Sequence, residues 1–264
     1  MDVRFWGVRG SVAVSGAAFQ RTGGNTTCVE LVHEGWRLIL DGGTGLAALG
    51  ASLGVAPVRA AVAFTHVHWD HIQGVPFFSP IWHPDAELVL AGRADLRASL
   101  TAQMRPPTFP VPLEATRARV DWTTLDSQKP WTYGPFVVTP LALDDHPDGV
   151  LVYRVAAGGR TVVFATDVEH GDALDPRLLR FAAGADLLVH DAQYRQSEYA
   201  GRRGWGHSTW EQAVDVADRA GCGRLALFHH DPTRGDAELD DIEAMAASRR
   251  PGTVIARESV PLAL

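Results

Sequence analysis

A run of metal-binding side chains directly after an apolar segment constrains this chain most. The run His-Val-His-Trp-Asp-His occupies residues 66–71 and follows the apolar segment 60–64, which has the composition of a buried strand. Side chains alternate along an extended segment, so His66 and His68 point the same way. Asp70 and its neighbouring histidine need a turn to aim at a second point. Imidazole and carboxylate ligands suit zinc, and also manganese or iron. The run therefore predicts two adjacent metal positions at one edge of a sheet.

Short apolar segments and helical periodicity predict a mixed α and β chain. The predicted strands cover 3–6, 28–32, 37–40, 60–64, 87–91, 136–140, 151–155, 161–165, 187–190 and 225–228. The predicted helices cover 45–53, 94–104, 176–183, 209–220 and 237–248. The run Ser-Thr-Trp-Glu at 208–211 has the form of a capping box, and Gly221 suits the end of that helix. Because no linker divides the sequence, we expect one domain spanning residues 1–264.

The segment 104–112 contains several prolines, which remove backbone donors and fix φ. It therefore predicts a stiff loop rather than regular structure. Two interpretations stay open at this point: the loop walls a pocket, or it simply connects two elements.

Further candidate ligands stand where other predicted strands stop. They are His146 in an Asp-Asp-His run, Asp167 after a threonine, and His229 and His230 side by side. A metal site built on the rim of a sheet requires polar residues at the ends of several strands, as found here. The Asp167 carboxylate could bridge two ions. Asp41 also ends a predicted strand. Its carboxylate could accept the second N–H of a ligating imidazole, or it could simply form a turn before the following glycine.

Composition limits the classes of partner and compartment. The formal net charge of −7 argues against a broad nucleic-acid surface, although bound metal ions would add local positive charge that this count omits. No stretch reaches eighteen apolar residues and the first residues lack a signal-peptide pattern, so neither a membrane span nor a leader is expected. Two cysteines, Cys28 and Cys222, are too few for a disulfide framework. We expect a cytoplasmic protein.

The order of these motifs resembles the metallo-β-lactamase-fold hydrolases over nearly the whole chain. That resemblance implies an α/β fold, a four-layer αββα sandwich with two divalent metal ions at one edge. It implies a first metal held by His66, His68 and His146, a second held by Asp70, His71 and His229, and Asp167 bridging both. Alignment by eye favours His229 over His230 as the last ligand.

The C-terminal third resembles the phosphodiesterase branch of these hydrolases, including RNase Z. The resemblance rests on the strand-like segment 185–194, which contains Asp191, and on the Gly-His-Ser-Thr run at 206–209. It implies that Asp191 orients His207, which assists phosphodiester cleavage. General chemistry supports the same role for His207. A departing alkoxide needs a proton, and a histidine held by a carboxylate can supply it. The alternative is that His207 merely precedes a helix cap.

The N-terminal segments 5–11 and 23–28 are similar to bacterial cyclic-nucleotide phosphodiesterases and to the cyclic-phosphate phosphodiesterase of phosphonate breakdown. Arg9 or Asn25 could meet a phosphate there, although turn structure explains the glycines equally well. The chain departs from two members of the branch. It has no Gly- or Lys-rich insertion for a tRNA-clamping arm, and two cysteines cannot build a Cys-rich zinc site.

These observations predict a dinuclear metal-dependent hydrolase that cleaves a small cyclic or nucleotide-like phosphodiester through a metal-bound hydroxide. Asp70 would align the attacking group, and His207, held by Asp191, would protonate the leaving oxygen. Zinc is the expected metal, with manganese or iron as alternatives. The rival functions are a thioester or lactone hydrolase, and a metal-binding regulatory module without turnover.

The expected partner is a small-molecule phosphodiester, with no membrane and with large nucleic acids disfavoured. The oligomeric state is not readable from the sequence, and a homodimer is compatible with it. The isolated histidines His33, His83 and His170 need no function. His190, beside Asp191, could support the site from behind.

Overall fold

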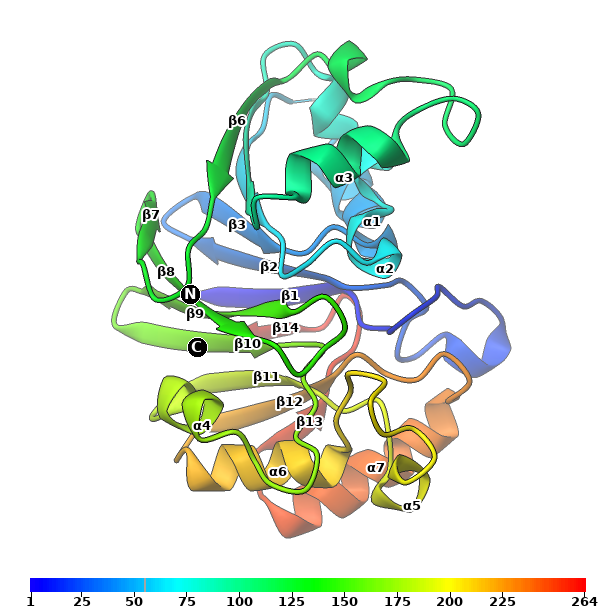
Figure 1. The fold of residues 1–264 in the computed structure, drawn as a ribbon, viewed down its shortest axis with the longest axis vertical. Helices are drawn as coiled ribbons and strands as arrows, with labels where there is room; N and C mark the ends of the chain where they lie inside the picture. Colours follow the sequence, from blue (N-terminus) through cyan, green and yellow to red (C-terminus); the bar gives the residue numbers. More distant parts are fainter. Residues whose placement is uncertain (55) are drawn as a thin grey trace.

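The computed structural model describes residues 1–54 and 56–264. Two seven-stranded mixed sheets pack face to face, with helices on their outer faces (Figure 1). The predicted αββα layering is therefore confirmed.

The first sheet has the strand order β14-β1-β2-β3-β4-β5-β6. Its strands are β14 (Pro261–Ala263), β1 (Asp2–Gly7), β2 (Cys28–His33), β3 (Trp36–Leu40), β4 (Arg59–Ala63), β5 (Glu87–Gly92) and β6 (Arg119–Thr124). The second sheet has the order β13-β12-β11-β10-β9-β8-β7. Its strands are β13 (Thr253–Ile255), β12 (Arg224–Phe228), β11 (Leu187–Asp191), β10 (Arg160–Ala165), β9 (Val150–Ala157), β8 (Phe136–Leu143) and β7 (Trp131–Tyr133).

The helices cover the outer faces of the two sheets, with α1 and α3 to the right of β3 and β6 in Figure 1 and α4, α6 and α7 below β11 and β12. The α-helices are α1 (Thr44–Leu53), α2 (Trp69–Ile72), α3 (Leu96–Gln103), α4 (Pro176–Ala182), α5 (Gln196–Tyr199), α6 (Trp210–Arg219) and α7 (Asp236–Arg249). Short 3₁₀ turns lie at Ala17–Phe19, Val75–Phe77, Ser79–Trp82 and Leu113–Ala115. None of the helices in the described parts of the chain combines the length and apolar character that crossing a membrane requires.

An apolar core fills the space between the sheets. Phe228 lies at its centre, with its ring centroid 5.8 Å from that of Phe5 and 5.5 Å from that of Phe164. Phe5 belongs to the first sheet and the other two rings to the second, so these contacts join the sheets. A second apolar cluster lies between the second sheet and its helices, and a third lies between the first sheet and its helices.

Strand direction decides where the polar residues gather. β3, β4 and β5 run parallel in the first sheet, and β10, β11 and β12 run parallel in the second. The carboxyl ends of parallel strands meet at one edge of a sheet. The residues that follow these strands therefore collect at a common rim of the sandwich.

All ten predicted strands and five predicted helices are present, with ends shifted by up to three residues. The predicted capping box is wrong by one residue. Thr209, not Ser208, is the N-cap of α6, and its hydroxyl accepts from Gln212 N at 3.1 Å. Ser208 instead donates its hydroxyl to Val168 O. Gly221 ends the helix in the left-handed region at φ 62°, as predicted.

Candidate metal centre

The His-Val-His-Trp-Asp-His run leaves β4 and closes into the single turn of α2. His66 and His68 precede that turn, whereas Asp70 and His71 lie within it. The turn lets two sequence neighbours aim at a point that an extended chain would not allow. This is the geometry that the sequence predicts for two adjacent positions.

The structure brings all seven predicted ligands into one cluster. Asp167 and His229 form one group with Asp191 and His207, in which the ligand atoms lie within 4.8 Å of one another. Three further overlapping groups at the same spacing contain predicted ligands alone: His66, His68 and His146; His66, His71 and Asp167; and Asp70, His71 and His229. The first and last of these groups are the two ligand sets expected from the resemblance.

Asp167 lies between the two sets. Its Oδ1 is 3.9 Å from the Nε2 atoms of both His66 and His146, and its Oδ2 is 3.3 Å from the Nε2 atoms of both His71 and His229. The carboxylate thus turns one oxygen toward each set. Asp167 follows β10 in a left-handed conformation, with φ 54°.

Four buried imidazoles use Nδ1 in hydrogen bonds to the surrounding protein. The pairs are His66 with Thr65 Oγ1 at 3.0 Å, His71 with Asp41 Oδ2 at 2.9 Å, His146 with Gly206 O at 3.0 Å, and His229 with Gln193 Oε1 at 2.9 Å. Carbonyl and carboxylate oxygens only accept, and the Thr65 hydroxyl donates to Asp41. Each Nδ1 therefore carries the proton, which leaves the Nε2 lone pair facing the cluster.

These lone pairs fit a cation. The Nε2 atoms of His66 and His71 are buried and make no hydrogen bond to any described residue. A buried acceptor without a partner is costly unless something else satisfies it. Neutral imidazoles with carboxylates are the donor set of divalent metals, so the residues fit the ions that the fold family implies.

The pKa shifts separate His66, which is neutral, from His71, which takes up a second proton unless a divalent ion offsets the surrounding carboxylates. Burial and the neighbouring His71 lower the pKa of His66 well below its usual value, so His66 is held neutral. Burial also opposes charge on His71, but the carboxylates of Asp70, Asp167 and Asp41 outweigh it and raise the pKa of His71 well above the usual value. The carboxylates thus require compensating positive charge, which divalent ions would supply.

Asp41 accepts a hydrogen bond from a candidate ligand, which was one of the two roles predicted for it. It is fully buried, accepts from Thr65 N at 2.7 Å through Oδ1, and accepts from His71 through Oδ2. Its φ of 62° also makes it a turn residue before the glycines, so both interpretations hold together.

His207 and Asp191 form the predicted pair beside the cluster. His207 Nδ1 lies 2.9 Å from Asp191 Oδ2 and 3.8 Å from Asp167 Oδ1. Burial alone would lower the pKa of His207, but Asp191, Asp167 and Asp70 outweigh it and raise the pKa to about 9. A protonated imidazole therefore stands next to the candidate ligands.

Glu169 supports the site, and the sequence analysis missed it. Its carboxylate is buried and accepts from Tyr199 Oη at 2.7 Å, Gly204 N at 2.8 Å and Gly206 N at 2.7 Å. The carbonyl of Gly206 in turn accepts from His146 Nδ1. Glu169 therefore fixes the loop that orients a candidate ligand. The only signal in the sequence was its spacing of two from Asp167.

The N-terminal glycine segment packs against the centre through its backbone. Ser11 N donates to Asp70 Oδ2 at 2.7 Å, and a Cβ on Gly10 would lie 2.4 Å from the His229 ring. Arg9 is fully buried and donates to the carbonyls of Gly23, Asp231 and Arg234. Its guanidinium therefore belongs to the scaffold rather than to a phosphate-binding surface.

Asn25 has a similar structural role. Its side chain donates to Glu258 Oε2 at 2.9 Å and accepts from Thr44 Oγ1 at 3.1 Å.

The two adjacent histidines after β12 separate. His229 Nε2 lies 3.3 Å from Asp70 Oδ2 in the cluster, whereas His230 Nε2 is 3.0 Å from the carbonyl of Ala256. The structure thus brings His229 to the candidate ligands and keeps His230 away.

His190 and His170 stack behind Asp191, with their Nε2 atoms 3.2 Å apart.

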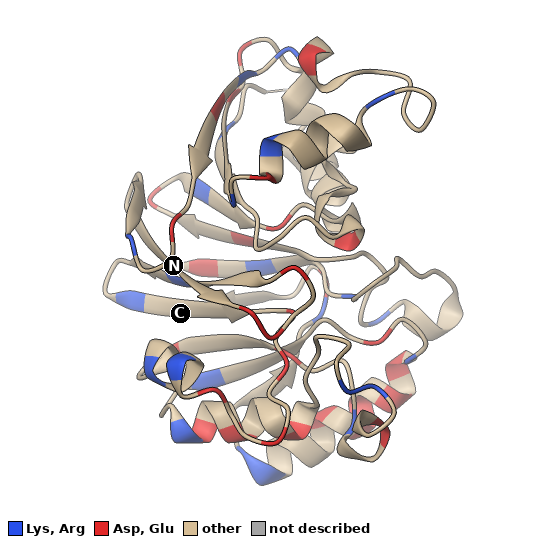
Figure 2. Ribbon diagram, in the orientation of Figure 1, with Lys and Arg blue, Asp and Glu red and all other residues tan. Residues whose placement is uncertain are grey.

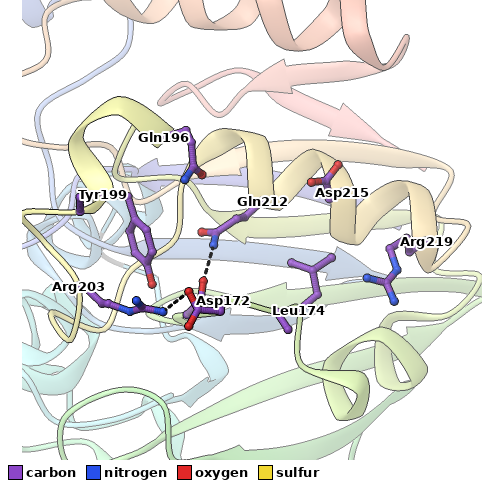
Figure 3. A pocket seen from close by; sticks show the side chains of 11 residues that line it. Asp172, Leu174, Gln196, Tyr199, Arg203, Gln212, Asp215 and Arg219 are labelled. Carbon is purple, nitrogen blue, oxygen red and sulfur yellow. Dashed lines mark hydrogen bonds and ion pairs between the residues drawn. The ribbon is translucent and has the colours of Figure 1, made fainter.

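A polar cavity of about 740 Å³ lies beyond the loop that Glu169 anchors. Figure 3 shows Arg203 paired with Asp172, and Gln212 directed toward the same segment, whose Gly171 carbonyl it reaches at 3.4 Å. None of the predicted site residues lines this cavity. It is therefore separate from the candidate centre.

Comparisons with known proteins agree with the fold. The model of a family described as the beta-lactamase superfamily domain matches residues 37–230. Ribonuclease Z of Gemmatimonas aurantiaca is 26% identical over 293 residues, covering 90% of this chain and 90% of that protein. The metallo-beta-lactamase fold protein YhfI of Bacillus subtilis has a TM-score of 0.75 at 23% identity and covers 99% of this chain and 98% of its own. A diphosphatase from the PhnP family has a TM-score of 0.76 at 16% identity, covering 100% and 97%.

Proposed function

The chain belongs to the metallo-β-lactamase superfamily of hydrolases, and from that premise we propose that it is a dinuclear metal-dependent phosphodiesterase. The proposed substrate is a small cyclic or nucleotide-like phosphodiester. Water is the second reactant, and cleavage of one P–O bond gives a phosphomonoester and a hydroxyl group, which remain in one molecule when the substrate is cyclic.

The proposed ligands divide into two sets that share one carboxylate. His66, His68 and His146 would hold one ion, Asp70, His71 and His229 the other, and Asp167 would contact both. Divalent ions held there supply Lewis acidity toward a phosphoryl oxygen and make water a stronger nucleophile at neutral pH. Zinc is the proposed metal, with manganese and iron as alternatives.

The observation that carries the proposal is that Asp191 holds the imidazole of His207 beside the candidate ligands. Cleavage of a P–O ester bond leaves an alkoxide, which needs a proton to depart as an alcohol. His207 binds Asp191 through Nδ1 and has a raised pKa, so it can donate the proton on Nε2 to that oxygen. Asp70, whose Oδ2 accepts from Ser11 N, would orient the attacking water. The similarity to a ribonuclease Z supports the same class of bond.

A small substrate is proposed because the chain lacks the charge of a nucleic-acid surface. It carries 24 Lys and Arg against 31 Asp and Glu. Figure 2 shows Lys and Arg positions interspersed with Asp and Glu positions along the ribbon. Binding along an RNA backbone depends on such basic contacts.

Hydrolysis assays test the proposal directly. The purified protein is assayed with bis-p-nitrophenyl phosphate, with nucleoside 2′,3′-cyclic phosphates, and with a lactone and a glutathione thioester. We expect turnover of the phosphodiesters and a fall of about 100-fold or more in kcat for His207→Ala, as for loss of a general acid. His83→Ala, at a partly exposed histidine outside the cluster, is the matched control.

Four results would contradict the proposal or part of it. Turnover of the lactone or thioester alone would favour the rival hydrolases, and bound metal without hydrolysis would favour a regulatory module. Faster cleavage of an RNA with a 3′ extension than of any small ester would contradict the proposed substrate size. Undiminished phosphodiester turnover in His207→Ala would remove its role as general acid.

A further inference from the structure

A second cavity, of about 510 Å³, opens beside the candidate ligands. Its wall includes Val67 and Trp69, which alternate with the ligand histidines in the run at 66–71. The His68 side chain is 37% exposed, more than that of any of the other six candidate ligands. The cluster is thus most open at His68, which stands in the sequence between the two residues of the run that wall the cavity.

Three aromatic side chains border this cavity. Trp69 and Phe77 are 68% and 62% exposed, which is unusual for rings of this size. Phe109 meets Phe77 edge to face, with centroids 5.8 Å apart and an interplanar angle of 83°. Phe109 belongs to the proline-rich segment that follows α3 (Figure 1). Phe109 and Thr108 line the cavity, so this loop walls a pocket, which was one of its two interpretations. Exposed aromatic faces in a concave site are the usual platform for a flat ring.

Two carboxamides give the same cavity polar character. Gln103 Nε2 donates to Ile72 O at 3.1 Å, whereas Gln103 Oε1 is buried and accepts from no described residue. Gln73 Nε2 donates to Thr26 Oγ1 at 3.3 Å, which leaves its own carbonyl oxygen to accept. The Gln103 oxygen is shielded from the open cavity, so the Gln73 carbonyl is the acceptor offered to a ligand that carries N–H groups.

We infer that this cavity binds the nucleobase of the substrate, stacked against Trp69 and Phe109, with Gln73 accepting from an amino group of the base. The inference rests on the proposed function, because it names the group that accompanies the scissile phosphate. Aromatic stacking tolerates any base, whereas the Gln73 carbonyl would favour bases with an exocyclic amine. The cavity in Figure 3 suits a base poorly, because an Arg203–Asp172 ion pair borders it.

Calorimetric titration with adenosine 5′-monophosphate and with ribose 5-phosphate tests the inference without turnover. The two ligands share the phosphate and the sugar, so the ratio of their affinities isolates the base. We expect this ratio to favour the nucleotide, and to fall about 10-fold in Trp69→Ala, as expected for the loss of one stacked base. Phe109→Ala should lower it in the same direction. Trp205→Ala is the matched comparison, since Trp205 is 56% exposed but lies outside the cavity.

The outcomes separate the cavity from the chemistry. A preference for the nucleotide that Trp69→Ala removes supports the base site even if no phosphodiester is hydrolysed, in which case only the proposed function fails. Equal affinity for both ligands in the wild-type protein overturns the inference, even if phosphodiesters are hydrolysed. A loss of preference in Trp205→Ala, with Trp69→Ala unchanged, also overturns it.

Discussion

His207 Nδ1 lies 2.9 Å from Asp191 Oδ2, and both side chains are buried at the rim of the sandwich. Asp191 also accepts from the backbone N–H groups of Ser208 and Gln193 through Oδ1, and from that of Asp167 through Oδ2. Four donors therefore fix the orientation of one carboxylate, and through it the position of the imidazole. The pair connects β11 with the loop before α6, two segments that only the fold brings together.

The charge on His207 should make the stability of the metal-stripped protein depend on pH. The pKa of His207 is raised from 6.5 to about 9 on folding, so its contribution is fully present below pH 6.5 and is lost as the pH rises through 9. Urea unfolding at pH 6 and pH 10 should show a smaller loss of stability in His207→Gln than in the wild type. Equal losses in the two proteins would contradict the raised pKa.

Asp41→Asn should weaken metal binding while the fold survives. Asparagine tolerates the left-handed φ of 62°, but it removes the negative charge that holds the Nδ1 proton of His71. Loss of such an outer partner lowers metal affinity by about 10- to 100-fold. Competition with a chromophoric chelator measures the affinity, and circular dichroism checks the fold. Unchanged affinity would show that Asp41 is only a turn residue.

Glu169→Gln should also weaken metal binding, although Glu169 is not itself a candidate ligand. A glutamine amide cannot accept at both ends, so one of the hydrogen bonds from Tyr199, Gly204 or Gly206 is lost and the carbonyl that orients His146 loosens. We expect about a 10-fold loss of zinc affinity in the same chelator assay. Asp172→Asn, whose side chain is 90% exposed on the same segment, is the matched control and should bind zinc normally.

Metal loading should raise the melting temperature, and Asp167 should carry much of that rise. A ligand at about 1,000 times its Kd stabilises the folded state by about 4 kcal/mol. Asp167→Asn keeps a residue suited to φ 54° but removes the charge between the two ligand sets. Thermal unfolding with and without zinc should therefore show a large shift in the wild type and a much smaller one in the variant. Equal shifts would exclude Asp167 from the metal site.

Phe228→Ala should destabilise the sandwich without touching the site's chemistry. The ring packs on Phe5 and Phe164 and is fully buried, so its loss should cost about 3–5 kcal/mol in urea unfolding. Val137→Ala, at a side chain that is 42% exposed, should change the stability by less than about 0.5 kcal/mol. A loss below about 1 kcal/mol for Phe228→Ala would mean that the two sheets are not held by this contact.

The sequence predicted the elements that bury a continuous apolar face and missed the ones that do not. β4 and β12 are short apolar runs that end in ligand residues, so both the strands and their polar ends were visible. β6 alternates weakly, and β7, β13 and β14 have three residues each, so neither period nor length distinguished them from loops.

The same contrast applies to the site. The candidate ligands form a local pattern of residue types, whereas the roles of Glu169 and Ser11 depend on which loops lie side by side. Ser11 acts through its backbone N–H, which leaves no mark on the choice of side chain. Arg9 shows the opposite error, because a conspicuous cation in a glycine-rich segment proved to be fully buried and bound to backbone carbonyls.

The candidate centre takes His66 and His71 from the first sheet and Asp167 and His229 from the second. Ions shared by these residues would tie the two sheets together at that rim, so local separation of the sheets would require ligand bonds to break first. The backbone amides of β4 and β10 lie just behind the ligands and should exchange with deuterium more slowly when the centre is loaded. Their exchange rates would then measure occupancy of the centre independently of any substrate.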